Sequence, residues 1–346
     1  MSKTLQDYAT LINDTIQSNE INHYITTDNM CQNLGGIDTF KNINIPQGKV
    51  RSFQKDDVLL SNIRLYFRKV YRAKQKGGCS SDVLVFRAKH IDSATLFAIL
   101  SSQIFTDYAR SGSQGSKMPR GNKTHMMDFK IPTINFTIAK IFNSIQNKIE
   151  NNHKINELLH TLAYKIYEYY FKYKPKNAKL EQIIIENSKS SILVKNAQKT
   201  QDKYPFFTSG DNILSYPKAI IDGRNCFLNT GGNAGIKFYV GKASYSTDTW
   251  CICANEFSDY LYLLLSSIKT HINQSFFQGT SLKHLQKNLL KKYPIYMPSE
   301  HEIKKFNQII MPLLTLISIN TRTSKKLEQI RDFLLPLLLK QQVKPK

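Results

Sequence analysis

Two stretches in the first half of the sequence combine cations with residue types suited to contact with phosphate groups and bases. Asp57–Tyr71 alternates basic with aromatic and β-branched residues, which predicts paired strands, with a solvated strand face as the alternative. Gly112–Lys123 predicts a glycine-rich loop whose backbone can approach a phosphate closely, against the alternative of an ordinary surface loop. The predicted contact residues are Arg64, Arg68, Lys69, Arg72, Lys117, Arg120 and Lys123.

Two segments of the second half are candidates for the same chemistry. The glycines of Thr230–Lys242 match neither a dinucleotide fingerprint nor a P-loop, so a β turn is expected there. Gln278–His284 stands where the first half has its basic glycine loop, but it carries mainly hydroxyl and imidazole groups. The predicted contact residues are Lys237, Lys242, Thr280, Ser281, Lys283 and His284.

The sequence carries no recognisable catalytic, cofactor-binding or metal-binding motif. It lacks HExxH, GxSxG and the nuclease pattern of carboxylates ahead of Glu-x-Lys. The eight histidines are scattered, and the five cysteines contain no CxxC pair, which argues against a zinc ribbon and a disulfide framework. We therefore expect no catalytic residue, no cofactor and no metal in this chain.

The net charge favours a polyanionic partner. The 346 residues include 48 Lys plus Arg against 26 Asp plus Glu, a formal charge of +22. Nucleic acid is the leading partner because each cation that neutralises a phosphate releases a condensed counterion; a merely basic surface is the alternative. The composition, 41% hydrophobic, predicts a folded core, and the length of 346 residues predicts about two domains. No stretch is long enough to span a membrane, and Met1–Gln17 lacks the apolar core of a signal peptide, so we expect a cytoplasmic protein.

The two halves of the chain resemble each other in a constant order. Gln114-Gly115-Ser116 matches Gln278-Gly279-Thr280 at an offset of 164, and the matches on either side have offsets of similar size. This order predicts two copies of an α/β domain, each followed by a long helix. The predicted boundaries are 1–137 for the first domain, 138–174 for the first helix, 175–300 for the second domain and 301–346 for the second helix.

The two predicted helices, Ile138–Phe171 and His301–Lys340, each have an apolar seam with a polar centre. The seams match in an antiparallel register in which residue numbers sum to 476, and a parallel register fits equally well. One antiparallel layer, Ile145 opposite Arg331, packs poorly. Two helices packed separately on their own domains are the alternative. The residues predicted to pair the helices are Asn152, Asn156, Leu159, Ile317, Asn320 and Leu327.

Several of these segments resemble the specificity subunit of type I restriction-modification enzymes. The resemblance is carried by Asp57–Tyr71, Gly77–Phe86, Gly115–Gly121, Lys203–Gly210, Thr247–Thr249 and Leu327–Pro336, in that order. It implies an α+β fold with two similar α/β target recognition domains separated by two long antiparallel coiled-coil helices, a pseudo-twofold internal repeat. It also implies that each domain reads one half of a bipartite DNA site and that the helices set the gap.

The resemblance further implies that the chain has no catalytic activity of its own. Its expected partners are double-stranded DNA, two methylation subunits and restriction subunits, without a membrane. S-adenosylmethionine, ATP and Mg are expected only in the partner subunits. Three alternatives remain: a coiled-coil scaffold, an anti-restriction mimic of the specificity subunit, and a self-sufficient DNA-modifying enzyme. The charge of +22 counts against a mimic of DNA, which would be acidic.

Overall fold

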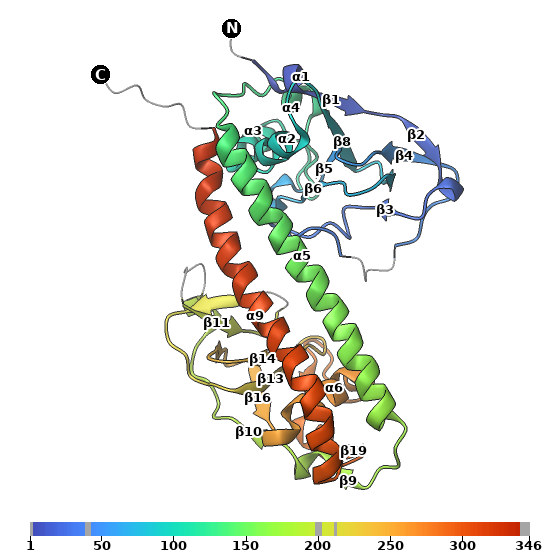
Figure 1. Ribbon diagram of the computed structural model, residues 1–346, viewed down its shortest axis with the longest axis vertical. Coiled ribbons are helices and arrows are strands. Elements are labelled where there is room, and N and C mark those ends of the chain that lie inside the picture. The colour runs from blue at the N-terminus through green and yellow to red at the C-terminus, as the bar shows by residue number, and fades with distance from the viewer. Residues whose placement is uncertain (1–2, 39–42, 198–202, 211–212, 340–346) are drawn as a thin grey trace. The chain divides into compact units, whose positions relative to one another are not determined.

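The computed structural model describes residues 3–38, 43–197, 203–210 and 213–339, which divide into two compact units (Figure 1). Unit 1 comprises Met1–Glu150 with Lys326–Lys346, and unit 2 comprises Asn151–Lys325. Each unit contains an α/β part and a portion of each long helix. The predicted four-part division instead separates the helices from the domains, and it stays a prediction.

Unit 1 contains two four-stranded sheets, with the strand orders β1-β8-β5-β6 and β2-β4-β7-β3. The strands of the first sheet are all antiparallel. The first sheet consists of β1 (Ala9–Ile12), β8 (Val83–Ala88), β5 (Val58–Ser61) and β6 (Val70–Arg72). The second consists of β2 (Thr15–Gln17), β4 (Lys49–Phe53), β7 (Gly77–Cys79) and β3 (Tyr24–Ile25). The helices are α1 (Leu5–Tyr8), η1 (Ser18–Glu20), η2 (Leu65–Phe67), α2 (Ser93–Leu100), α3 (Gln103–Ser111) and α4 (Lys123–Met127).

The central strands β5 and β8 of unit 1 begin with continuous runs of buried apolar residues, Val58–Leu60 and Val83–Phe86, because both faces of their sheet are covered. On β5, Val58 and Leu60 pack in one core with α2, while Leu59 packs in a second core with Ile25 and Phe53 of the other sheet. Side chains alternate between the faces of a strand, so a continuous apolar run fits a sheet buried on both sides. The layers of unit 1 are therefore helix, sheet and sheet.

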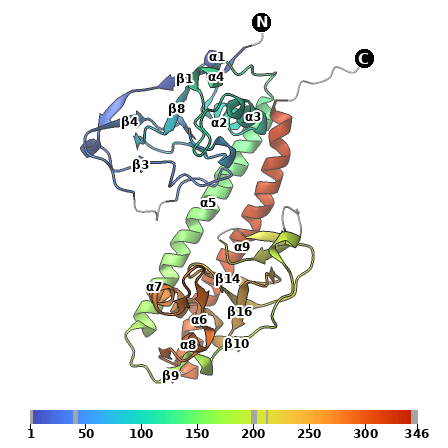
Figure 2. The same cartoon turned by 180° about the vertical axis from the view of Figure 1, so that it is seen from behind.

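Unit 2 contains a four-stranded sheet of order β10-β16-β13-β14, a three-stranded sheet of order β12-β11-β15 and two short ribbons. The strands are β9 (Ala178–Lys179), β10 (Ile185–Glu186), β11 (Tyr204–Phe207), β12 (Leu214–Tyr216), β13 (Arg224–Asn229), β14 (Ile236–Val240), β15 (Ser244–Tyr245), β16 (Thr249–Cys253), β17 (Phe277–Gln278), β18 (His284–Leu285) and β19 (Pro294–Ile295). The helices are η4 (Leu180–Gln182), η5 (Val194–Ala197), η6 (Asn255–Phe257), α6 (Ser258–Ser267), α7 (Lys269–Ser275) and α8 (Lys287–Lys291), the last three labelled in Figure 2.

Unit 2 has the same layers as unit 1. Cys226 and Leu228 of β13 pack in a core with α6, and the intervening Phe227 packs in a second core with Phe207 of the three-stranded sheet. In the β1-β8-β5-β6 sheet of unit 1 and the β10-β16-β13-β14 sheet of unit 2, the first strand along the chain lies beside the fourth, followed by the second and the third. All neighbours in these two sheets are antiparallel.

Two long helices complete the units: α5 (Phe136–Tyr167), which continues as a π-helical turn η3 (Glu168–Lys172), and α9 (Glu300–Leu338). Their bounds lie within a few residues of the predicted ones. A capping box starts α9, since the Ser299 amide donates to the Glu302 carboxylate and holds the pKa of Glu302 at about 2. Across the described residues, no helix combines the length and apolarity needed to span a bilayer.

Polar side chains join the two helices in unit 2. Asn152 Nδ2 donates to Ser324 Oγ at 3.2 Å, and Asn320 Nδ2 donates to Asn156 Oδ1 at 2.9 Å. Residue numbers rise along one helix as they fall along the other, so the two segments run antiparallel within this unit. Leu159 and Ile317 lie beside these contacts in the apolar core of unit 2. Leu327 lies in unit 1, where it is half-buried.

The predicted poor layer at Arg331 is a polar contact in unit 1. Arg331 is only 2% exposed, and its guanidinium donates to Gln146 Oε1 at 3.0 Å, to the Asn33 carbonyl at 3.3 Å and to the Asp332 carboxylate at 3.1 Å. Gln146 in turn donates to the Leu34 carbonyl at 2.8 Å. The helices therefore hold a segment of the α/β part, Asn33–Leu34, whose two residues both have the left-handed backbone conformation.

We expect Arg331→Ala to lower the free energy of unfolding by about 3 kcal/mol, because it leaves the Gln146 and Asn33 oxygens buried without a donor. Urea denaturation of the full chain measures this change. Lys304→Ala, at an exposed position of the same helix, is the control and should change stability by less than about 0.5 kcal/mol. Equal effects of the two substitutions would contradict the assignment.

Candidate nucleic-acid interface

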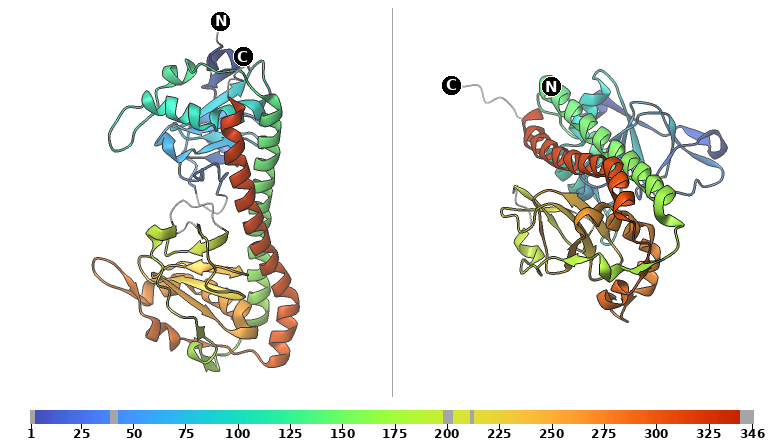
Figure 3. Two further views of the ribbon diagram at one scale, coloured as in Figure 1. Left: turned by 90° about the vertical axis from the view of Figure 1, so that its left-hand side faces the viewer. Right: turned by 60° about the horizontal axis from the view of Figure 1, so that its bottom comes forward.

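In unit 1 the predicted basic glycine loop is closed by two backbone hydrogen bonds. The Gln114 amide donates to the Arg120 carbonyl, and the Arg120 amide donates to the Gln114 carbonyl, both at 2.9 Å. Gly115 has φ +99°, a conformation that side-chain-bearing residues rarely adopt, and it begins the tip of the loop. Figure 3 (left) shows this loop, between α3 and α4, extending away from the rest of unit 1.

The base of this loop is docked on the turn that follows β5. The Gly121 amide donates to the Asn62 carbonyl at 3.1 Å, and the Arg64 amide donates to the Pro119 carbonyl at 2.9 Å. A Cβ on Gly121 would lie 2.1 Å from Met126 Cε and 2.9 Å from Leu65 Cδ1, so a larger residue would force these two buried side chains to move. The loop is therefore attached to the sheet by its backbone, while its tip stays exposed.

The Gln278–His284 loop of unit 2 is built in the same way. Gln278 pairs with His284 across the β17–β18 ribbon, and Gly279 has φ +139°. The loop is docked on the turn that follows β13: the Leu285 amide donates to the Thr230 carbonyl at 3.0 Å, and the Gly232 amide donates to the Lys283 carbonyl at 2.9 Å. The strands β5 and β13 have the same place in the order of their sheets.

The loop cations of unit 1 lie on its surface. Lys117 and Lys123 are exposed, and the exposed Arg120 forms an ion pair with Asp82 at 3.0 Å. Arg64 reaches the loop from the neighbouring turn, donating from Nη2 to the Lys117 carbonyl at 3.4 Å. The structure therefore brings four of the predicted contact residues of unit 1 together at this loop.

The prediction that Asp57–Tyr71 forms only paired strands is wrong for its centre. Arg64 and Arg68 flank a 3₁₀ turn, η2, and both adopt the left-handed conformation, with φ values of 50° and 48°. A strand cannot continue through that conformation, so β5 and β6 pair on either side of the turn.

The other three predicted contact residues around that turn, Arg68, Lys69 and Arg72, contact groups within unit 1. Arg68 donates to the Ser101 carbonyl at 2.9 Å, and burial lowers the pKa of its guanidinium. Lys69 Nζ donates to the Thr27 carbonyl at 2.5 Å, and Arg72 lies 3.7 Å from the Asp56 carboxylate. The side chains of Arg68 and Arg72 are only 15% exposed. DNA contact by these residues stays a prediction.

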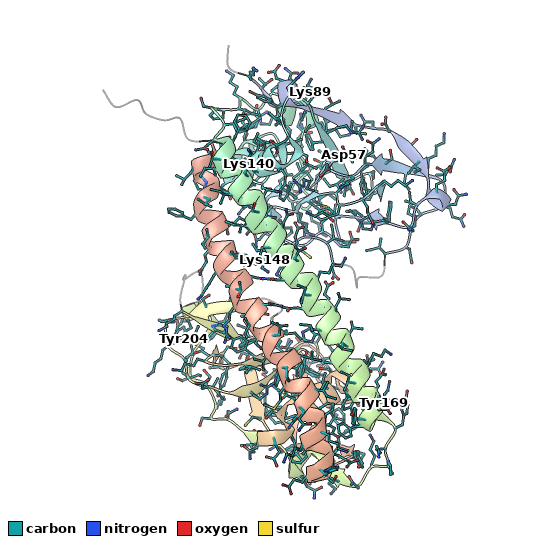
Figure 4. All side chains as sticks on the ribbon, viewed as in Figure 1. Asp57, Lys89, Lys140, Lys148, Tyr169 and Tyr204 are labelled. Atoms are coloured by element: carbon teal, nitrogen blue, oxygen red, sulfur yellow. The ribbon has the colours of Figure 1, made fainter. Side chains whose placement is uncertain are left out.

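In unit 2 the hydroxyl and imidazole groups of the loop are exposed, at Thr280, Ser281 and His284, as is Lys283. Lys237 lies elsewhere: its Nζ donates to the Thr208 carbonyl at 2.9 Å and to Asn229 Oδ1 at 3.3 Å. Lys242 is exposed at an open pocket, which Tyr204, labelled in Figure 4, and the segment Pro217–Asp222 also line.

The structure adds residues that the sequence patterns did not single out. The guanidinium of Arg110, on α3, lies 5.8 Å from the ring centre of the exposed Tyr66 on η2, which places a further cation beside the basic loop. Met118 and Leu282 are exposed at the tips of the two loops. The 164-residue offset that relates Gln114 to Gln278 also relates these two residues, so the repeat was a signal that could have found them.

Comparison with known proteins identifies part of the chain directly. Residues 176–329 match the family described as type I restriction modification DNA specificity domain. The chain contains a type I specificity domain. This domain includes the Gln278–His284 loop and the turn on which it is docked. The resemblance to type I specificity subunits that the sequence indicated is thereby confirmed.

A solved structure shows a similar fold over nearly the whole chain. The S subunit of a type I restriction-modification system from M. genitalium matches 99% of this chain and 96% of its own, with a TM-score of 0.63 and 14% identity. At that identity the likeness shows a shared fold. The HsdS subunit from Thermoanaerobacter tengcongensis matches 97% of this chain and 95% of its own at 13% identity, but its TM-score of 0.37 is too low to support an argument. No curated protein matches the sequence.

We expect Gly279→Ala to loosen the unit 2 loop, because the added Cβ would lie 2.4 Å from the Leu282 carbonyl oxygen in a strained backbone conformation. Hydrogen exchange of the Leu285 and Gly232 amides, which hold the loop to the sheet, should accelerate by roughly tenfold or more, as expected for a cost above about 1 kcal/mol.

The control for this substitution is Gly223→Ala. Gly223 has φ +99°, but no atom lies within 4 Å of the position of its Cβ. It should leave exchange at Leu285 and Gly232 unchanged, and faster exchange there in this control would contradict the assigned cause.

Proposed function

We propose that this chain is the non-catalytic, sequence-specific DNA-binding subunit of a type I restriction-modification complex. In this proposal each unit reads one half of a bipartite DNA site with its glycine loop, and the paired helices set the gap between the halves. The observation that carries the proposal is the same backbone-docked loop in both units of a chain that contains a DNA specificity domain.

The equivalence of the two loops supports the idea of two related readers. Both are closed by a glutamine and a residue six positions later, both have a left-handed glycine next, and both dock on the turn after the second strand of their sheet. Their side chains differ, with Lys117 and Arg120 in one loop standing where Ser281 and His284 stand in the other. Two scaffolds of one design with different contact groups suit two different half-sites.

The charge distribution supports duplex DNA as the ligand. Exposed lysine and arginine side chains at the unit 1 loop suit phosphates, which fix the position of a protein on the duplex. The overall excess of +22 supplies affinity that does not depend on sequence. Specificity then rests on the side chains at the loop tips.

The helix contacts support a role in setting the gap. Buried or half-buried asparagines hydrogen-bonded between helices cost stability but specify one register, so they resist sliding of α5 along α9. A fixed register is what a constant separation between two half-sites requires. In this proposal the length of the two helices determines the distance between the half-sites.

The proposal assigns the chemistry to partner subunits. Two methylation subunits and the restriction subunits would supply S-adenosylmethionine, ATP and Mg. Exposed apolar side chains on the long helices, among them Leu158 and Leu162 on α5 and Phe333 on α9, support docking of other chains there.

Coexpression with cognate type I methylation subunits, followed by sequencing of modified bases, should reveal methylation at a two-part motif with a constant gap. Replacing 93–132 with the corresponding segment of another type I specificity subunit should change one half of the motif and leave the other half and the gap unchanged. A change in both halves would refute the two-reader proposal, and an assembled complex without site-specific binding would favour a scaffold.

Lys117→Ala should weaken DNA binding by the complex to target and non-target duplexes alike. It removes one exposed cation of the unit 1 loop, so the slope of log K against log salt concentration should become shallower by about one. Lys55→Ala, at an exposed position outside the loop, is the control and should leave the slope unchanged. Fluorescence anisotropy at several salt concentrations measures both.

A further inference from the structure

Both loop tips expose one large apolar side chain at the same position. Met118 is 53% exposed and Leu282 is 57% exposed. Each lies four residues after the glutamine that closes its loop. A single exposed apolar residue on a protein surface needs no explanation. Two of them at matched positions, in loops that otherwise differ in chemistry, indicate a shared role.

In each tip the glycine that follows the glutamine lies opposite the backbone of this residue. An ideal Cβ on Gly115 would lie 3.5 Å from the Met118 carbonyl oxygen, and one on Gly279 would lie 2.4 Å from the Leu282 carbonyl oxygen. In both loops the left-handed glycine therefore faces the carbonyl of the apolar residue. The glycine permits a tight tip in which the carbonyl turns inward while the side chain stays exposed.

The surroundings of the two tips favour DNA over a protein partner. Met118 follows Lys117 and lies within a loop whose base holds Arg120. Leu282 lies between Ser281 and Lys283. An apolar side chain flanked by cations and hydroxyl groups suits a duplex, whose phosphates lie on either side of an apolar stack of bases.

We propose that Met118 and Leu282 are wedges that insert between base pairs, each in its own half-site, and locally unstack the duplex. This inference rests on the proposed DNA-binding function. Apolar side chains of this size are known to part base steps, and a step that is already weakened costs less to open. Local unstacking would also make it easier for a methylation subunit to extrude the base that it modifies.

The test uses the full chain assembled with its methylation subunits and a duplex that carries the mapped target motif. A single mismatch is moved through each half-site in turn, and affinity is compared with that for the intact duplex. The wild-type complex should bind at least about tenfold more tightly when the mismatch lies at the base step where Met118 or Leu282 inserts. A mismatched pair is already weakened, so less free energy is needed to unstack it. A 2-aminopurine placed there should brighten on binding to the intact duplex.

Met118→Ala should abolish the mismatch preference and the fluorescence increase in one half-site only, and Leu282→Ala should abolish them in the other. Met118→Leu and Leu282→Met should keep both signals, since each introduces the residue that the other loop carries. Leu289→Ala is the matched control, because Leu289 is 45% exposed in the same unit as Leu282 but lies on α8.

Normal site-specific binding without any mismatch preference would overturn the wedge proposal and leave the proposed function intact. Loss of assembly with the methylation subunits in Met118→Ala or Leu282→Ala would overturn it as well, because the tips would then contact protein. Absence of site-specific binding by the wild-type complex would instead refute the proposed function.

Discussion

The attachment of each recognition loop by backbone hydrogen bonds is the constraint on which the rest of the proposed interface depends. In unit 1 the Gly121 and Arg64 amides hold the loop to the turn after β5, and in unit 2 the Leu285 and Gly232 amides hold the equivalent loop after β13. No side chain takes part in these bonds. The side chains at the tips can therefore differ between the units while the loops keep the same attachment to their sheets.

Hydrogen bonds also attach the α/β part of each unit to the long helices. In unit 1, Arg331 and Gln146 bind the backbone carbonyls of Asn33 and Leu34. In unit 2, Ser318 of α9 accepts the Val240 amide at 3.0 Å, and Arg224 of β13 donates to Thr315 of α9 at 3.0 Å. Directional polar contacts of this kind orient one element on another, which apolar packing alone does less strictly.

Much of the fold and part of the site could be read from local patterns. The bounds of α5 and α9 follow from long apolar seams without internal glycine, and the strands β5 and β8 from short continuous apolar runs. The aromatic and β-branched residues at the centre of Asp57–Tyr71 favour a strand, but this segment forms the turn η2. Tertiary contacts instead hold Arg64 and Arg68 in the left-handed conformation, with the Arg68 carbonyl accepting the Leu34 amide and the Arg64 amide bonded to Pro119.

By itself the sequence determined the family resemblance, the polyanionic partner expected from the charge, and the offset that relates the two glycine loops. These depend on residue types and spacing, which a linear pattern contains. Only the tertiary structure decided which cations are available, since Arg68, Lys69 and Arg72 bond within unit 1 while Lys117 and Lys123 are exposed. It also decided that Arg331 bonds with Gln146 and that Met118 and Leu282 stand at the loop tips. The physical reason is that availability depends on partners distant in sequence, which no local pattern records.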